Sequence, residues 1–125
     1  SPSLARLEGE WTLHYLLRDG QEVPAMMRSM GRRVGKENHV QVSFGGQIVV
    51  DALIRIDESH RPQFIDYLNV GGPAKDTIQF GIMEWRGAEA CFCMAAPGQS
   101  RPENFECPAG SGRTLSIWRL KEKAS

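Results

Sequence analysis

Hydrophobic and polar residues alternate along most of this chain, at the period of two that is typical of half-buried β-strands. The first such stretch covers residues 9–18, ends at the turn pair Asp19-Gly20, and has four apolar side chains on one face: Trp11, Leu13, Tyr15 and Leu17. Six further stretches follow, separated by turn signals, at residues 39–44, 47–56, 64–70, 78–85, 88–95 and 115–121. The spacing predicts an all-β chain whose successive strands run antiparallel.

One short segment breaks this alternation. Pro24 stands where the first residue of a helix is expected, and Gly31 would end that helix after barely two turns. The segment carries Met26, Met27 and Met30. The pattern therefore predicts one short helix after the first strand.

Length and composition indicate a single domain spanning residues 1–125. With 125 residues, of which 41% are hydrophobic, the chain can bury one core without disulfide or metal support. Its 15 basic and 15 acidic residues cancel, so no net charge favours a nucleic acid, an anionic membrane or an acidic substrate. No run of about 18 apolar residues offers a membrane span.

The amino-terminal residues show no recognisable targeting signal. Ser1-Pro2-Ser3 is not followed by the charged and apolar regions of a secretory signal. Because the chain begins without Met, we expect a processed mature protein or a domain excised from a longer one. Its location stays open between secreted or periplasmic and cytoplasmic.

Residues that could bind metals or cofactors are scattered. His14, His39 and His60 lie tens of residues apart and show no ligand spacing, so we expect no metal site and no cofactor. The glycines lack the strand–loop–helix context of a phosphate-binding loop, and we interpret them as turns: Gly35, Gly45-Gly46 and Gly110-Ser111-Gly112.

The cysteines argue against a disulfide scaffold. Cys91, Cys93 and Cys107 are an odd count, so at least one thiol stays free. Residues two apart in a strand lie about 6.5 to 7 Å from each other, which is too far for a good disulfide. A bond from Cys107 to either of the other two stays geometrically open.

Seven short sequence blocks follow one another along the chain in a definite order. They are Leu7-Glu8-Gly9-Glu10-Trp11, Asp19-Gly20 with Val23-Pro24, Pro62 with Ile65-Asp66, Gly81-Ile82 with Glu84, Cys93 before Ala96-Pro97-Gly98, Arg101-Pro102 with Phe105, and Gly110-Ser111-Gly112. In order and spacing the chain resembles a family of small bacterial lipocalin-like domains of uncharacterised function, from about Leu7 to Lys123. The resemblance implies an antiparallel barrel of about eight strands, with one short helix after the first, and it implies no reaction.

The resemblance also implies a contact between the first and last strands. In lipocalins an Arg of the final strand packs over the indole of the Gly-x-Trp motif, and Arg119 stands at that place relative to Trp11. Such a cation–π contact contributes about 0.5 to 2 kcal/mol. In the alternative, Trp11 is an ordinary core residue and Arg119 is solvated.

The hairpin made by residues 78–85 and 88–95 is apolar on both faces. By the resemblance its inward set is Met83, Trp85, Ala90, Phe92 and Met94. Barrel strands normally have a polar outer face, so the apolar outward set should be covered: Phe80, Ile82, Cys91 and Cys93. The cover is either a second subunit or neighbouring domain, or the C-terminal loop or short helix of this chain.

A barrel of about eight strands is just wide enough either to be packed solid or to hold one small ligand. In the second case the candidate pocket is formed by Tyr15, Met83, Phe92 and Met94, under a lid that carries Met26, Met27 and Met30. Methionine adapts to irregular apolar shapes, which suits such a lid. In the alternative these methionines only fill the core.

Three functional hypotheses follow. The chain is most simply a non-catalytic binding module for a small apolar ligand. The alternative is a protein-interaction or inhibitor-like domain that acts through its outer surface and residues 97–112. The third is a small barrel enzyme with polar groups at its mouth, although Asp66 and Glu84 are expected in ion pairs or turn hydrogen bonds rather than as inward carboxylates.

Overall fold

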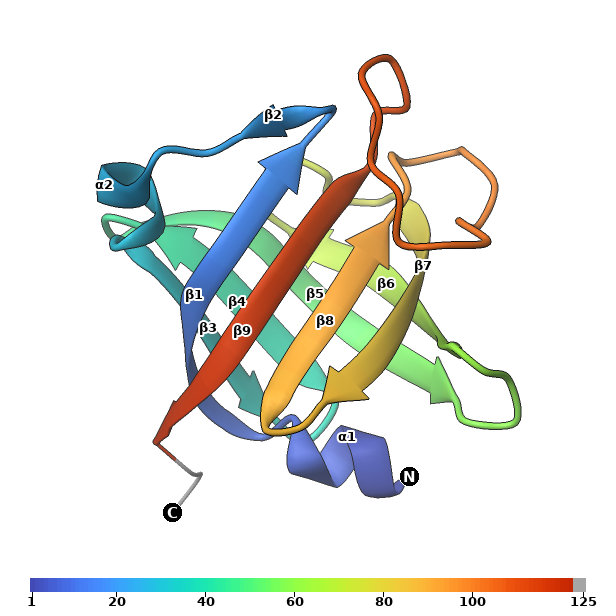
Figure 1. Cartoon of the computed structure of the whole chain (residues 1–125). Coiled ribbons are helices and arrows are strands. Elements are labelled where there is room, and N and C mark those ends of the chain that lie inside the picture. Colours follow the sequence, from blue (N-terminus) through green and yellow to red (C-terminus); the bar gives the residue numbers. More distant parts are fainter. Residues whose placement is uncertain (123–125) are drawn as a thin grey trace.

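The barrel closes because its first long strand pairs with its last. In the computed structural model, which describes residues 1–122, eight long strands form one antiparallel sheet, and the end of the sheet returns to its beginning (Figure 1). The strands are β1 (Gly9–Arg18), β3 (Gly31–Lys36), β4 (His39–Phe44), β5 (Gln47–Asp57), β6 (Gln63–Gly71), β7 (Ile78–Arg86), β8 (Glu89–Met94) and β9 (Thr114–Glu122). The two-residue β2 (Gln21–Glu22) pairs only with the end of β1. The predicted all-β closed barrel is confirmed.

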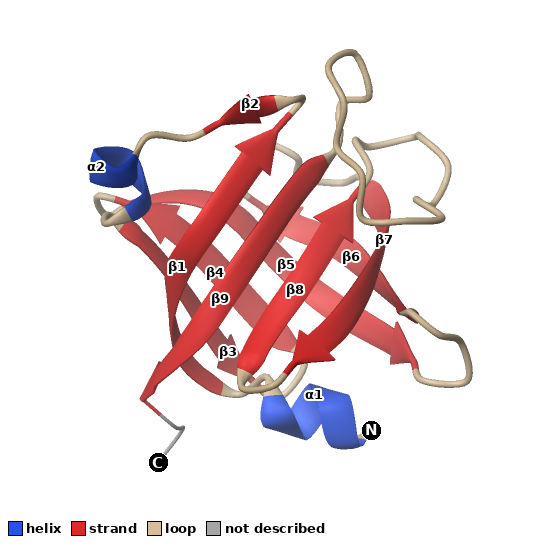
Figure 2. Cartoon of the chain, in the orientation of Figure 1, coloured by secondary structure: helices blue, strands red, loops and turns tan. Residues whose placement is uncertain are grey.

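Two short helices lie at opposite ends of the barrel (Figure 2). The predicted helix after the first strand is confirmed as α2 (Ala25–Arg28). The other, α1 (Pro2–Arg6), was not predicted, although its signals are present: the Ser1 hydroxyl accepts a hydrogen bond from the Leu4 N–H, and Pro2 lies in the first turn. It leads into Leu7, which is buried in the core.

Strand β3 is the element that the sequence pattern did not predict. It is rich in glycine and basic residues and has Val34 as its single hydrophobic residue, so it lacks the apolar alternation of its neighbours. It nevertheless pairs with β4 over its whole length and with β1 from Arg32 to Gly35, and Arg33 lies opposite both Trp11 and Val42. The interpretation of Gly35 as a turn was wrong. Gly35 lies within β3, where an added Cβ would come 2.7 Å from the Leu7 carbonyl oxygen.

A β-bulge in β1 changes which side chains face the interior. Leu13 pairs with Trp118 and Tyr15 pairs with Ile117, so His14 has no partner of its own in β9. One extra residue reverses the alternation, because the side-chain period of a strand is two. Leu16 therefore lies in the core, and the prediction that Tyr15 shares the inner face with Trp11 was wrong.

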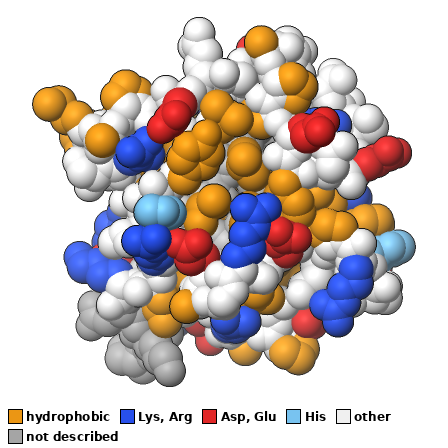
Figure 3. Space-filling model, in the orientation of Figure 1, with side chains coloured by type: hydrophobic (Ala, Val, Ile, Leu, Met, Phe, Trp, Pro, Cys, Tyr) orange, Lys and Arg blue, Asp and Glu red, His pale blue; other side chains and the backbone are white. Residues whose placement is uncertain are grey.

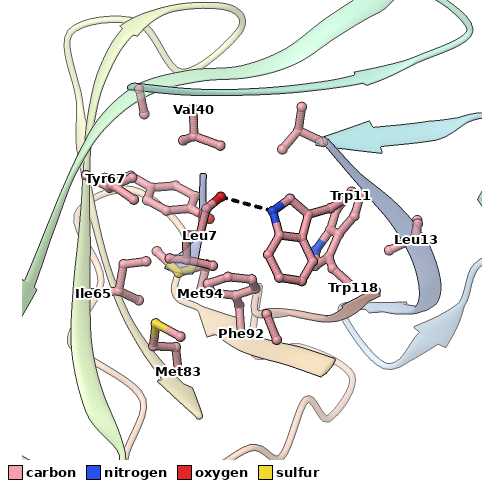
Figure 4. Close-up of a cluster of buried hydrophobic side chains, with 14 of the residues drawn as sticks. Leu7, Trp11, Leu13, Val40, Ile65, Tyr67, Met83, Phe92, Met94 and Trp118 are labelled. Carbon is pink, nitrogen blue, oxygen red and sulfur yellow. Dashed lines mark hydrogen bonds between the residues drawn. The ribbon is translucent and has the colours of Figure 1, made fainter. Parts of the chain in front are cut away.

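The interior contains one hydrophobic cluster (Figure 4). Its buried members come from α1's end and from every long strand except β3: Leu7, Trp11, Leu13, Leu16, Val40, Val42, Ala52, Ile54, Ile65, Tyr67, Met83, Ala90, Phe92, Met94 and Trp118. The predicted inward faces of Met83, Phe92 and Met94 agree with this placement. Strand β3 contributes a charged side chain instead, that of Arg33.

Trp11 is buried at the end of the barrel near α1, where its Nε1 donates a hydrogen bond to the Leu7 carbonyl at 2.9 Å. The predicted packing of Arg119 over Trp11 was wrong. Arg119 points outward, and its Nε lies 2.6 Å from Glu89 Oε2. Trp118, one residue earlier in β9, is buried instead, and its Nε1 donates to the hydroxyl of Ser116, which is buried on the same face.

The outer face of the β7–β8 hairpin is covered by the chain's own loop, residues 95–113. Ile82, Cys91 and Cys93 are 0 to 1% exposed. The Cys93 thiol donates to the Glu106 carbonyl of this loop, and Arg101 Nη1 donates to the Gly81 carbonyl at 2.7 Å. The prediction of an interaction surface formed by Phe80, Ile82, Cys91 and Cys93 was therefore wrong, and the alternative of a covering loop was right.

Candidate functional site

The segment that carries Met26, Met27 and Met30 does not cover the interior of the barrel as a lid would, because these side chains are exposed. Met26 is 81% exposed, Met27 50% and Met30 47%, and hydrophobic side chains are visible over α2 in Figure 3. Helix α2 is a single turn held beside β1 and β2, because Arg28 Nη1 donates to the Val23 carbonyl and contacts Glu22. These methionines are thus separated from the buried Met83, Phe92 and Met94, with which the sequence analysis grouped them.

A hollow of about 450 Å³ lies at the other end of the barrel, where its lining residue Trp85 contacts Ser3 and Arg6 of α1. Its wall is formed by the β5–β6 connection and by the paired ends of β6 and β7: Arg61, Pro62, Gln63, Met83, Glu84 and Trp85. Gln63 is the register partner of Met83 across the two strands. Because Gln63, Ile65 and Tyr67 share one face of β6, this wall is continuous with the hydrophobic core.

Gln63, one of the residues that line the hollow, has a buried polar atom without a partner in the described chain. The residue is 7% exposed, and its Oε1 is buried with no hydrogen-bond partner among residues 1–122. A buried acceptor without a partner costs about 1 to 3 kcal/mol. The period of two along residues 63–67 could have identified Gln63 as inward-facing, although the predicted strand began one residue later.

Helix α1 fixes the Trp85 side of the hollow. The Arg6 guanidinium lies 3.8 Å from the centroid of the Trp85 ring, and Trp85 Nε1 donates to the Ser3 hydroxyl at 3.1 Å. Arg6 Nη2 also donates to the Gly87 carbonyl in the turn between β7 and β8. The indole is thereby held against the Trp11 ring, with centroids 6.1 Å apart. The wall of the hollow is thus set before any ligand arrives.

Arg33 lies deeper in the interior. It is 2% exposed; its Nη1 donates to the Tyr67 hydroxyl at 2.9 Å, and its guanidinium carbon lies 4.4 Å from the centroid of the Phe92 ring. Its Nε and Nη2 have no hydrogen-bond partner within the described part of the chain. The sequence pattern does not identify this residue, because its strand was not predicted and a basic segment flanked by glycines gives little sign of burial.

Two carboxylates that the sequence blocks include are engaged in local contacts. Asp66, which the blocks of the resemblance singled out, binds Arg55 and Arg101 on the outer side of β6, and Glu84 contacts Arg86, so both form the expected ion pairs. Burial raises the pKa of the Cys91 and Cys93 thiols to about 11. In residues 1–122, no three His, Cys, Asp or Glu side chains gather as metal ligands would, and no helix there is long and apolar enough to cross a membrane.

Comparisons of the chain with protein-family models, with curated proteins and with solved structures gave no match. The closed eight-stranded antiparallel barrel stands on the structure itself. No comparison shows membership of a lipocalin-like family, which stays a resemblance.

Proposed function

We propose that this barrel is a non-catalytic binding module for a small, mainly apolar ligand, and that the ligand enters the hollow beside Gln63 and Met83. The observation that carries the proposal is the unpartnered Oε1 of Gln63 in a wall that is otherwise continuous with the hydrophobic core. The proposal keeps the ligand class that the sequence analysis favoured. It moves the entrance from the α2 end of the barrel to the α1 end.

The size and chemistry of the hollow support this proposal. Its volume of about 450 Å³ lies within the range of known small-molecule sites, about 300 to 1,000 Å³. Met83, Trp85 and Pro62 offer apolar contact, and Gln63 accepts one hydrogen bond from a ligand N–H or O–H. Arg61 and Glu84 supply charges at the rim. The hollow thus combines three apolar residues with three polar ones, and polar groups placed among apolar contacts can orient a small ligand.

The alternative function, a protein-interaction or inhibitor-like domain, has less support. Three of the four side chains predicted for its surface are buried beneath residues 95–113, which include the loop at residues 97–112 that was expected to reach a partner. We therefore favour the binding module.

Titration with an environment-sensitive apolar dye tests the proposal. We expect saturable binding with a stoichiometry near one, and at least tenfold weaker binding by Gln63→Glu, because a carboxylate in a buried wall must be desolvated or protonated. Met27→Glu is the charge-matched control at the opposite end and should bind like the wild type, with circular dichroism showing that both variants are folded. Weaker binding by Met27→Glu alone would place the site under α2 and overturn the proposed entrance, and no saturable binding would overturn the function.

A further inference from the structure

The interior of this barrel contains a cation that its own residues leave half-bonded. Arg33 is 2% exposed, and of its three guanidinium nitrogens only Nη1 has a hydrogen-bond partner within residues 1–122. Arginine stays protonated in proteins, and a buried charge without a hydrogen-bonded partner is strongly unfavourable. An apolar side chain at this position would fill a hydrophobic core better. The guanidinium therefore needs an explanation other than packing.

No carboxylate of the described chain provides one. The ion pairs of residues 1–122 do not include Arg33, and the buried Asp66 faces the opposite side of β6 from Tyr67, where it binds Arg55 and Arg101. The groups that do surround the guanidinium are the rings of Phe92 and Tyr67, whose faces attract a cation but accept no N–H hydrogen bond of ordinary strength.

The free donors of Arg33 form a matched pair. Nε and Nη2 lie side by side on one edge of the planar guanidinium, and two parallel N–H bonds from such an edge fit the two oxygens of a carboxylate. The Tyr67 hydroxyl accepts from Nη1 and keeps its own proton, which it can donate to the same group. Arg33 and Tyr67 together thus offer up to three donors to one anion.

Two neighbouring side chains, Phe92 and Met83, connect Arg33 to the hollow. The Phe92 ring that packs against Arg33 belongs to the register partner of Met83, and Met83 forms part of the wall of the hollow. A methionine side chain is unbranched and readily changes its rotamer, so a ligand seated in the hollow can displace it and reach the interior. The order from the surface inward is therefore the rim, Met83, Phe92 and Arg33.

We propose that the ligand of this barrel is an apolar monocarboxylic acid, whose carboxylate binds Nε and Nη2 of Arg33 and whose apolar part occupies the hollow between Gln63 and Trp85. The proposal rests on the proposed function and names its ligand class. It assigns Arg33 and Tyr67 as the residues that select an acid over a neutral molecule of the same shape.

Paired titrations with octanoate and 1-octanol test the acid specificity, since the two probes share a chain and differ in charge. We expect the wild type to bind octanoate at least tenfold more tightly than 1-octanol by isothermal titration calorimetry. Arg33→Met should lose the preference for octanoate, so that the ratio of its affinities for the two probes falls to about one. Tyr67→Phe should reduce this ratio several-fold.

A second measurement does not depend on any variant folding. In wild-type protein labelled with ¹⁵N-arginine, octanoate should shift one arginine Nε–H resonance that exchanges slowly with solvent, as a buried group does, while 1-octanol should leave it in place. Equal binding of the two probes, or no such shift at saturation, would overturn the carboxylate site and leave the binding module standing. If neither probe nor the apolar dye binds, the proposed function itself fails.

Discussion

The guanidinium of Arg6 lies 3.8 Å from the centroid of the Trp85 ring, and this contact ties the first helix to the end of β7. The resemblance to lipocalins implied a cation–π contact at the base of the barrel between Arg119 and Trp11. The structure has such a contact near that end, but it is formed by different residues. Helix α1 thereby stabilises this end of the barrel and forms contacts with the wall of the candidate site.

Replacing Arg6 should measure the strength of this connection. Arg6→Ala removes the contact with Trp85 and the hydrogen bond to the Gly87 carbonyl, and should lower the free energy of unfolding by about 1 kcal/mol. Arg119→Ala is the matched control, since its exposed ion pair with Glu89 is screened by water and should contribute less. Urea unfolding followed by tryptophan fluorescence gives both values. An equal or larger loss in the control would contradict the assignment.

Trp11 should be among the most important residues for stability. It is 2% exposed, belongs to the central cluster and donates a buried hydrogen bond to Leu7. Trp11→Ala should lower the free energy of unfolding by about 3 to 5 kcal/mol. A loss below about 1 kcal/mol in chemical denaturation would show that the base of the barrel is not organised around this indole.

Arg33 should lower the stability of the ligand-free protein. Arg33→Met exchanges a buried, half-bonded cation for a side chain that suits the core, and should raise the free energy of unfolding of the ligand-free protein by about 1 to 4 kcal/mol. Adding Tyr67→Phe should preserve or increase the gain, because the Tyr67 hydroxyl would otherwise lose its partner. Lower stability of both variants than of the wild type would show that Arg33 supports the fold directly.

Alkaline pH should destabilise the protein through its buried thiols. Burial raises the pKa of Cys91 and of Cys93 from the ordinary value of 9.0 to about 11. Because the fold favours the neutral thiol, this contribution is fully present below pH 9 and is lost as the pH rises towards 11. Urea midpoints measured across this range should fall, and the Cys91→Ala/Cys93→Ala variant should show a smaller decrease. Parallel decreases in both proteins would contradict this cause.

The same burial should protect the thiols from reagents. Cys91, Cys93 and Cys107 are free and buried, so a thiol reagent at neutral pH should modify them slowly in the native protein and completely in urea. Rapid modification of the native protein would indicate that the loop at residues 95–113 opens readily from the hairpin.

Most strands could be predicted because their apolar residues repeat at a period that only a half-buried strand requires. The predicted first strand has the same bounds as β1, Gly9–Arg18, and the hairpin turn at Gly45-Gly46 lies between β4 and β5 as predicted. Strand β3 was not predicted because it lacks this apolar repeat. Its inward position is occupied by Arg33, so the repeat that marks a strand is broken at the residue that makes the interior polar.

The sequence by itself determined the fold class, since alternation and turn chemistry depend only on residues that are close together in the chain. The tertiary structure decided which faces turn inward after the bulge at His14, which loop covers Cys91 and Cys93, and where α2 lies. It alone placed Arg33 beside Tyr67 and Phe92. Those contacts join residues 34 and 59 positions apart in the chain, and only closure of the barrel brings them together.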